Sequence, residues 1–529
     1  MGLIAKFASV GGATAASRVL GFGREAAIAG LLGAGPVADA FYAALRFPNL
    51  FRRIFAEGPL NAAFVPLFTG ALHGSPDDPD AGRRLARELA SDIASLLFFA
   101  LLAFTAVAVA FMPFLTDTLV APRFPRPSEK FDLTVTLTRV MFPYLAAMTF
   151  AALMAGVLNA FSRYFLAALA PTLLNVVLIA VLALGWRRGV DQATLGLWMA
   201  IGVTVSGALQ LLLLAYAIRR EGFGFSILRR PRLSPGVRRF LALALPAVLT
   251  GGVTQINLLV GQMIASAQGG AIALINYADR IFQLPLGIIG IAIGIVLLPE
   301  LTRALKGDRM AEARSLQNRS LEFALLLTLP AAVGLTIMPG PIIAVLFERG
   351  AFTPETTARA AEVLRAFAWG LPAFVLVKVF QPAFYAREDM RLPLYATIAN
   401  VAVNVALSLA LFPTMGPAGI GMATSAAGWL NAAILAVVAI SRGLFAPSPR
   451  TVRLVMAIIL GAGLMGAALW WANGEVASLI ATGPFPVRAA LVLALVGLAS
   501  IVHFTVVFVA GGMKLADLKG MAKRESVRG

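Results

Sequence analysis

The chain has 529 residues, of which 59% are hydrophobic and 13% are charged, with a formal net charge of +18 and no cysteine. This composition is typical of polytopic helical membrane proteins and leaves no separate soluble domain. The absence of cysteine excludes disulfides, thiolate nucleophiles and sulfur-ligated metals. Nucleic-acid binding is also disfavoured, because no basic domain with interleaved aromatic residues lies outside the apolar segments.

The apolar runs predict an all-α membrane protein with fourteen spans, each long enough for a hydrocarbon core about 30 Å thick. The predicted spans are 9–33, 36–70, 92–116, 138–160, 165–186, 193–218, 240–265, 271–302, 320–340, 362–386, 392–412, 416–441, 454–473 and 488–512. Lysine and arginine gather in the loops near 83–87, 219–239 and 303–319 and in the tail at 514–528. The positive-inside rule therefore predicts that both termini are cytoplasmic.

The first span carries cations where a lipid-facing helix has none. Ser17 and Arg24 share one face of the predicted helix, and Arg18 lies on the neighbouring face. Each arginine at a helix centre costs roughly 2.5–3.5 kcal/mol in lipid, so we expect these side chains to face a hydrated cavity or an anionic partner. Because arginine binds phosphate through a planar fork, a phosphate-bearing ligand is the favoured anion.

The second span continues this charged pattern with 3-4 spacing. Its polar positions are Asp39, Tyr42, Arg46, Asn49 and Arg53, with Arg52 beside them. We expect Asp39 to orient or partly neutralise the cations. Arg53 and Glu57 are four residues apart, so a helix-end ion pair is the favoured interpretation and a gating role is the alternative.

A weak internal repeat relates the second span to the eighth, which suggests two lobes around a central cavity. Arg280 in the eighth span is the predicted fourth anion ligand. Pro48 and Pro285 each remove a backbone donor within a span, and both a static kink and a gate remain open. Gly290 favours close helix packing over a mobile gate, and Lys378 either snorkels or lines the cavity.

No catalytic, metal or cofactor site is predicted. His73 lies in a polar loop and His503 stands alone in an apolar span, so structural roles are favoured for both. Oxygen ligands for a coupling ion are available in the second half, but no carboxylate accompanies them in their spans. These amides are Gln255, Asn257, Asn400 and Asn404.

Several motifs resemble the MurJ (MviN) family of lipid II flippases, within the multidrug/oligosaccharidyl-lipid/polysaccharide exporter superfamily. The resemblance extends over essentially the whole chain and is strongest in the first two spans. The matching motifs are Ser17-Arg-Val-Leu-Gly-Phe-Gly-Arg-Glu25, Asp39-Ala-Phe, Phe47-Pro-Asn-Leu-Phe-Arg-Arg-Ile-Phe-Ala-Glu-Gly58, Ala63-Phe-Val-Pro66, Tyr277-Ala-Asp-Arg280, Leu298-Pro-Glu-Leu301 and Phe384-Tyr-Ala-Arg-Glu-Asp389. One departure is Gln283, where some members carry glutamate, so an acidic partner for Arg280 is not expected there.

The resemblance implies a fourteen-helix transporter of the bacterial inner membrane, acting in peptidoglycan synthesis and cell-wall biogenesis. It implies an N-lobe at 1–220, a cytoplasmic linker at 221–239, a C-lobe at 240–441, and two added helices within 442–529 that form a groove for a polyprenyl tail. Family cavity arginines match Arg18, Arg24, Arg52 and Arg280, with Asp39 and Asn49 in the matching cavity motif.

The implied cargo is lipid II, which moves from the cytoplasmic to the periplasmic leaflet by alternating access, and the expected partners are this lipid and the membrane, with the chain acting as a monomer. Two alternatives remain. A multidrug or polysaccharide-lipid exporter shares the fold, but the arginines would repel a hydrophobic cation. An intramembrane glycosyltransferase would need a base near the cations, and Asp39 and Glu57 are the only candidates in the first half.

Overall fold

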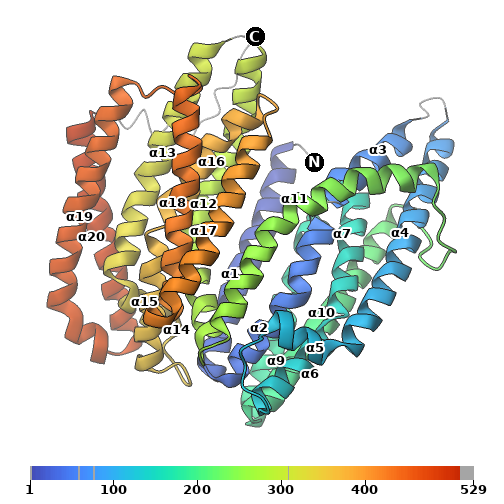
Figure 1. The fold of residues 1–529 in the computed structure, drawn as a ribbon, viewed down its shortest axis with the longest axis horizontal. Helices are drawn as coiled ribbons and strands as arrows, with labels where there is room; N and C mark the ends of the chain where they lie inside the picture. The colour runs from blue at the N-terminus through green and yellow to red at the C-terminus, as the bar shows by residue number, and fades with distance from the viewer. Residues whose placement is uncertain (1–2, 58–59, 75–77, 308, 513–529) are drawn as a thin grey trace. The chain divides into compact units, whose positions relative to one another are not determined.

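The computed structural model describes residues 3–57, 60–74, 78–307 and 309–512, and the regular elements in these ranges are all helices (Figure 1). The prediction of an all-α membrane protein is therefore confirmed. Eleven helices in the described residues are long and apolar enough to cross a membrane. They are Asp80–Ala110, Glu129–Ala160, Tyr164–Arg188, Gln192–Arg220, Ala271–Gly290, Met310–Ile337, Pro354–Tyr385, Arg391–Met415, Pro417–Ser441, Pro449–Ile480 and Phe485–Gly511.

The three other predicted spans, 9–33, 36–70 and 240–265, are largely helical but are not among these eleven. The first corresponds to α1 (Leu3–Leu32), which carries Arg18 and Arg24 of the candidate site. The last corresponds to α11 (Pro235–Ala265), one continuous helix of 31 residues. The count of fourteen spans thus stays a prediction.

The second predicted span is not one continuous α-helix. It comprises α2 (Pro36–Arg52), the π-helical turns η1 (Arg53–Glu57) and η2 (Leu60–Phe64), and α3 (Val65–His73). The sequence between the two π turns is Gly58-Pro59, which lies outside the described residues. A π turn shifts the backbone bonding to i→i+5, so side chains beyond Arg52 leave the 3-4 register that α2 sets.

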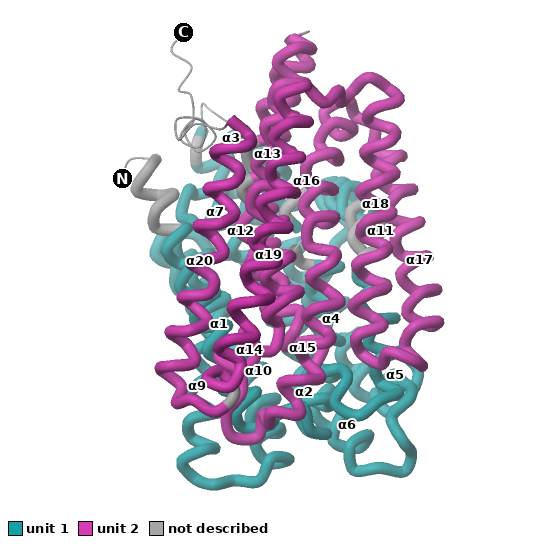
Figure 2. Tube along the Cα trace, turned by 90° about the vertical axis from the view of Figure 1, so that its left-hand side faces the viewer, with its two compact units in different colours: residues 1–273 teal, residues 274–529 magenta. Residues whose placement is uncertain are grey.

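The chain divides into two compact units, residues 1–273 and 274–529 (Figure 2). This boundary differs from the predicted lobes because α11 packs on α2, α4, η1, η2 and η3 of the first unit. The predicted arrangement of two six-helix lobes stays a prediction. The other helices of the first unit are α4 (Pro79–Ala110), α5 (Met112–Leu115), η3 (Thr116–Val120), α6 (Glu129–Met141), α7 (Tyr144–Ala160), α8 (Tyr164–Leu169), α9 (Thr172–Arg188) and α10 (Gln192–Arg220).

The predicted linker at 221–239 is docked on the first unit. Phe223 is buried and packs its ring against Phe68 and Phe161, at centroid distances of 5.5 and 5.4 Å. The amide of Ser226 donates to the hydroxyl of Ser91 at 3.1 Å. Because an aromatic anchor and a backbone hydrogen bond hold it, this segment packs as a part of the unit and does not run as a free connection.

The second unit contains most of α12 (Ala271–Lys306) and all the later helices. These are α13 (Met310–Ile337), α14 (Pro339–Phe347), α15 (Pro354–Ala368), α16 (Leu371–Tyr385), α17 (Arg391–Met415), α18 (Pro417–Ser441), α19 (Pro449–Thr482) and α20 (Phe485–Gly511). The last two helices lie side by side as an antiparallel pair, and α19 also packs on α13 (Figure 1).

Helix starts in the loops are set by short polar side chains that accept a hydrogen bond from the first turn. Six helices begin in this way, and in four of them a proline occupies the first helical position, where its missing amide costs nothing. The capping residues are Asp78, Ser128, Asp191, Ser234, Thr353 and Ser448.

Candidate anion-binding site

The first helix presents its two arginines in different environments. Arg18 is exposed, and no described residue forms an ion pair or hydrogen bond with its side chain. Arg24, less than two turns further along α1, is only 7% exposed. One cation is therefore available to a ligand, whereas the other is already enclosed by protein.

Arg24 is the centre of a buried polar network between α1, α2 and α9. Its guanidinium forms a salt bridge with Glu25 and donates to Oδ1 of Asn175 at 2.9 Å. The second oxygen of Glu25, which is 1% exposed, accepts a hydrogen bond from the hydroxyl of Tyr42 at 2.6 Å. The amide of Asn175 donates to the backbone carbonyl of Ser17 at 3.0 Å, which completes the link to α1.

This network changes the argument drawn from the cost of a buried arginine. The sequence prediction holds that Arg24 needs an anionic ligand because its charge is otherwise uncompensated. Glu25 supplies that negative charge, so the resting protein does not require a bound anion at this position. In the described part of the chain Nε of Arg24 has no hydrogen-bond partner, which leaves one buried donor unused.

On α2 the cations are partly buried. Arg46 and Arg52 are both of intermediate exposure, and Nε of Arg52 donates to Oδ1 of Asn49 at 3.1 Å. Arg53 begins η1 and is exposed, while the side chain of Glu57 lies outside what the structure describes. The structure thus pairs Asn49 with Arg52, and the proposed pair of Arg53 with Glu57 stays a prediction.

Asp39 is placed differently from the expectation that it orients the cavity cations. Its carboxylate is fully buried and accepts from Nζ of Lys130 at 2.7 Å. It also accepts from the backbone amides of Gly270 and Ala273, at 2.7 and 2.9 Å, where α12 begins. Both carboxylate oxygens already accept hydrogen bonds, so the geometry indicates a structural tie between α2, α6 and the start of α12.

Arg280 belongs to the second unit and is partly buried on α12. Gln283 donates a hydrogen bond to Asp279, one turn earlier on the same helix. Tyr277 is fully buried and packs against Phe347 and Phe352, at centroid distances of 5.4 and 5.3 Å. This aromatic contact fixes the rotation of α12 just before Arg280.

The gate candidates other than Arg53 and Glu57 lie within α-helices. Pro48 and Pro285 lie inside α2 and α12, both of which continue beyond the proline. Lys378 is exposed on α16, and its Cγ lies 3.9 Å from where a Cβ on Gly290 would stand. That distance is an ordinary van der Waals contact, and both close packing at Gly290 and a gating role for any of these residues stay predictions.

Neither histidine joins a metal cluster in the residues that the structure describes. His503 is fully buried on α20, with Nε2 3.2 Å from the carbonyl of Leu326 on α13. A Cβ on Gly461 would stand 3.1 Å from its Nδ1, so the glycine makes room for the ring between α19 and α20. His503 therefore packs α20 against α13 and α19.

Sequence reasoning missed three members of the site: Glu25 as an internal counter-ion, Asn175 and Lys130. A signal existed for Asn175, because it is the only polar amide in the charge-free run between Tyr164 and Trp186. An amide in such a run needs a partner on another helix, and this is the role that the structure shows.

Comparison with known proteins places the whole chain among relatives of one kind. The family model described as lipid II flippase MurJ matches residues 28–491. A relative from Rhizobium meliloti (strain 1021), named probable lipid II flippase MurJ, is 47% identical over 527 residues, covering 99% of this chain and 97% of the relative. The lipid II flippase MurJ of Burkholderia cenocepacia is 32% identical, covering 89% of this chain and 90% of the relative.

Two kinds of solved structure share the fold. A lipid II flippase MurJ in an inward closed conformation has a TM-score of 0.74 and 24% identity, covering 93% of this chain and 97% of that chain. An inward-facing multidrug transporter of the MATE family has a TM-score of 0.65 and 17% identity, covering 80% of this chain and 94% of that chain. At these identities both likenesses show the fold alone.

Proposed function

The chain belongs to the MurJ family of lipid II flippases, and from this premise we propose that it moves lipid II from the cytoplasmic to the periplasmic leaflet by alternating access. Flipping is transport and not catalysis, so the glycosyltransferase alternative has no remaining support. The superfamily's multidrug exporters share the fold, but Arg18, exposed and without a partner among the described residues, disfavours a hydrophobic cation as cargo.

The diphosphate of the cargo is proposed to bind Arg18, Arg24, Arg52 and Arg280, with Ser17, Arg46 and Asn49 as neighbouring polar groups. The observation that carries this proposal is the contrast along α1: Arg18 is exposed without a protein partner in the described residues, and Arg24 keeps one donor unused. A diphosphate offers dense negative charge and multiple acceptors to these guanidinium groups.

Glu25 gives this site a resting state. Before cargo arrives, Glu25 neutralises Arg24 and Tyr42 holds the carboxylate in place. An arriving diphosphate competes with Glu25 for the same guanidinium, so Arg24 exchanges one anion for another and is never left uncompensated. Such an exchange avoids the several kcal/mol penalty of a bare buried charge.

Translocation of lipid II by the purified full-length protein in liposomes tests this proposal. Replacing Arg18, Arg24, Arg52 or Arg280 by alanine should abolish translocation while the protein remains in the membrane, and lysine should rescue only partly because it lacks the planar fork. The matched control is Arg84→Ala, since Arg84 is exposed and paired with Asp78 at 3.4 Å. Full translocation by all four alanine variants would refute the arginine assignment.

The chain is a multi-pass membrane protein, and its orientation is part of the proposal. We expect both termini in the cytoplasm and the chain in the bacterial inner membrane, because the basic loops gather on one side. Reporter fusions after Arg84, Arg230 and Arg524 should read cytoplasmic, and a fusion near Arg126 should read periplasmic. A periplasmic signal at Arg230 would overturn this orientation.

A further inference from the structure

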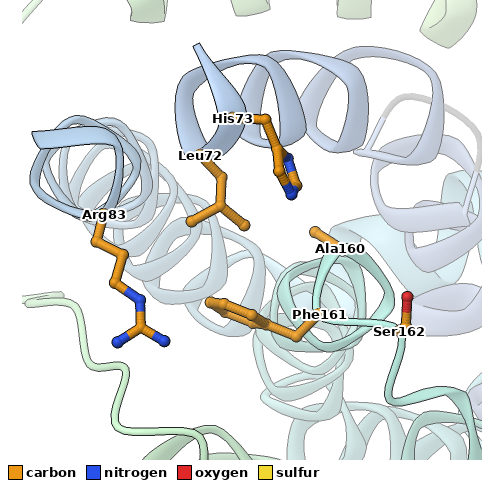
Figure 3. A pocket seen from close by; sticks show the side chains of 6 residues that line it. All are labelled: Leu72, His73, Arg83, Ala160, Phe161 and Ser162. Carbon is orange, nitrogen blue, oxygen red and sulfur yellow. The ribbon is translucent and has the colours of Figure 1, made fainter. Parts of the chain in front are cut away.

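A pocket of about 400 Å³ lies in the first unit where α3 and α7 end, near the beginning of α4 (Figure 3). Its position separates it from the candidate anion site, because none of its residues belongs to α1 or α2. The lining residues are Leu72, His73, Arg83, Ala160, Phe161 and Ser162.

The pocket combines an apolar wall with three kinds of polar group. Leu72 and Phe161 form the wall, and Phe161 is held by ring contacts to Phe68 and Phe223 at 6.3 and 5.4 Å. Arg83 contributes a guanidinium group, and the exposed Ser162 contributes a hydroxyl. A ligand that carries an anionic group, a hydroxyl group and a hydrocarbon chain matches this lining.

His73 presents an acceptor to the pocket. Its Nδ1 lies 3.0 Å from the backbone carbonyl of Thr69, which can only accept, so Nδ1 carries the proton. In this tautomer Nε2 is an acceptor, and no residue in the described ranges bonds to it. Figure 3 shows the ring extending from its helix toward Ala160, across the pocket.

The arginines near the pocket differ in whether they are already paired. Arg84 pairs with Asp78, and Arg163 pairs with Glu221 at 2.9 Å. In the part of the chain that the structure describes, Arg83 and Arg87 form no ion pair, although both are exposed. They are four residues apart on α4, which places them on one face about 6 Å apart along the axis.

Arg87 also links this face to the pocket wall. Its guanidinium lies over the ring of Phe223, 5.6 Å from the centroid, and Phe223 in turn packs on Phe161. Two guanidinium groups without a carboxylate among the described residues therefore flank one side of a pocket that has an apolar wall on another side. Such charges attract anions most strongly where water is partly excluded.

The surface residues around the pocket indicate that it lies at the level of the lipid headgroups. Tyr164, Phe165 and Tyr216 lie near the same helix ends and are 41%, 46% and 58% exposed. Leu85, two residues after Arg83, is 51% exposed. Exposed aromatic residues next to basic residues are typical of the boundary between hydrocarbon and water.

From this arrangement we infer that the pocket binds the phosphoglycerol headgroup of an anionic glycerophospholipid. Arg83 and Arg87 bind the phosphodiester, the glycerol hydroxyls donate to Nε2 of His73 and to Ser162, and the first acyl carbons lie along Leu72 and Phe161. The hydroxyl donors matter because a choline headgroup has none and cannot replace the water at the exposed His73 with a hydrogen bond of its own. This inference stands independently of the proposed cargo.

Binding is tested by native mass spectrometry of the full-length protein in detergent, titrated with phosphatidylglycerol. The double variant Arg83→Gln, Arg87→Gln should bind the first lipid about 5- to 30-fold more weakly, as expected for two arginines near a headgroup. The matched control Arg84→Gln should bind within about twofold of the unchanged protein, because that arginine already pairs with Asp78. Equal weakening in both variants, or in neither, would overturn the inference.

Two competition arms identify the source of the phosphate. Phosphatidylcholine should bind much more weakly, and millimolar inorganic phosphate should not displace phosphatidylglycerol. Displacement by inorganic phosphate would show a site for the free anion, and displacement by equimolar undecaprenyl diphosphate would assign the pocket to the cargo route. Either result would refute a phospholipid site.

A local measurement guards against a misfolded double variant. Added phosphatidylglycerol should slow hydrogen–deuterium exchange of segments 78–87 and 158–163 in the unchanged protein but not in the double variant. Exchange of α18, which is remote in sequence from the pocket, serves as the folding control and should be equal in both proteins. Slowing of the two segments in the double variant would contradict the inference.

Discussion

Replacing Glu25 by glutamine tests the buried network around Arg24 most directly. Glutamine keeps the size of the side chain and an oxygen that accepts from Tyr42, but it removes the charge that compensates Arg24. Arg24 and Glu25 are 7% and 1% exposed, so water cannot replace the lost partner without local opening. The perturbation is therefore mainly electrostatic.

The size of the effect follows from this burial. Removing one partner of a buried ion pair costs about 3–5 kcal/mol, because the remaining charge is left uncompensated. For a chain of 529 residues, each kcal/mol corresponds to about 1–2 °C in the unfolding midpoint, below the value for smaller domains. We expect Glu25→Gln to lower the midpoint by about 3–10 °C.

The assay is thermal unfolding of detergent-purified protein, followed by intrinsic fluorescence. Tyr42→Phe removes one hydrogen bond to a charged group and should cost less, about 1.5–3 kcal/mol. Glu88→Gln is the matched control, because Glu88 is exposed on α4, and it should change stability by less than about 0.5 kcal/mol. Adding Arg24→Met to Glu25→Gln should restore part of the loss, since the uncompensated charge is then absent.

Two outcomes would refute this reasoning. The first is a midpoint for Glu25→Gln equal to that of Glu88→Gln, which would mean that Arg24 is compensated elsewhere. The second is a double variant with Arg24→Met that is less stable than Glu25→Gln alone. Partial recovery of the Glu25→Gln midpoint by added pyrophosphate would in addition support competition between carboxylate and diphosphate.

Two further predictions concern carboxylates outside this network. Asp39→Asn should destabilise the first unit by about 3 kcal/mol in the same unfolding assay, because Lys130 loses its counter-ion. Adding Lys130→Met to Asp39→Asn should recover part of that loss. Unchanged stability of Asp39→Asn would contradict the structural role. The hydrogen bond from Arg442 holds the pKa of Asp389 below its usual range. This pair therefore stabilises the fold above the unfolded pKa and loses that contribution as the pH falls through the lowered pKa, so Arg442→Gln should lower the midpoint at neutral pH and converge on the unchanged protein in acid.

Helix positions were predictable wherever an apolar run ends at proline or glycine residues that mark a helix boundary. The predicted span 416–441 corresponds to Pro417–Ser441, because a proline opens the helix and glycine precedes it. The two π turns within the span 36–70 were not predictable from the sequence, because a π turn depends on which backbone carbonyls tertiary packing leaves available to accept. Hydropathy reports burial in lipid and carries no information on that choice.

The candidate site was predictable in its cations but not in its pairing. Adjacent residues on a helix point about 100° apart, so Arg24 and Glu25 did not suggest a pair by spacing. The pair forms because Asn175 and Tyr42, from two other helices, hold the two side chains toward each other. Asp39 shows the same limit, since its partners lie 91, 231 and 234 residues away in sequence.

The cost of burying a charge thus applies unequally to the arginines of the first helix. Arg24 already has a carboxylate, so a ligand gains there only the difference between two anions. Arg18 has no partner among the described residues and is exposed, so a ligand there gains the full interaction but against water. A diphosphate that spans both positions competes only with water for Arg18, whereas at Arg24 it replaces the carboxylate of Glu25. Cargo affinity should therefore depend more on Arg18, whereas the return to the resting state should depend more on the Arg24–Glu25 pair.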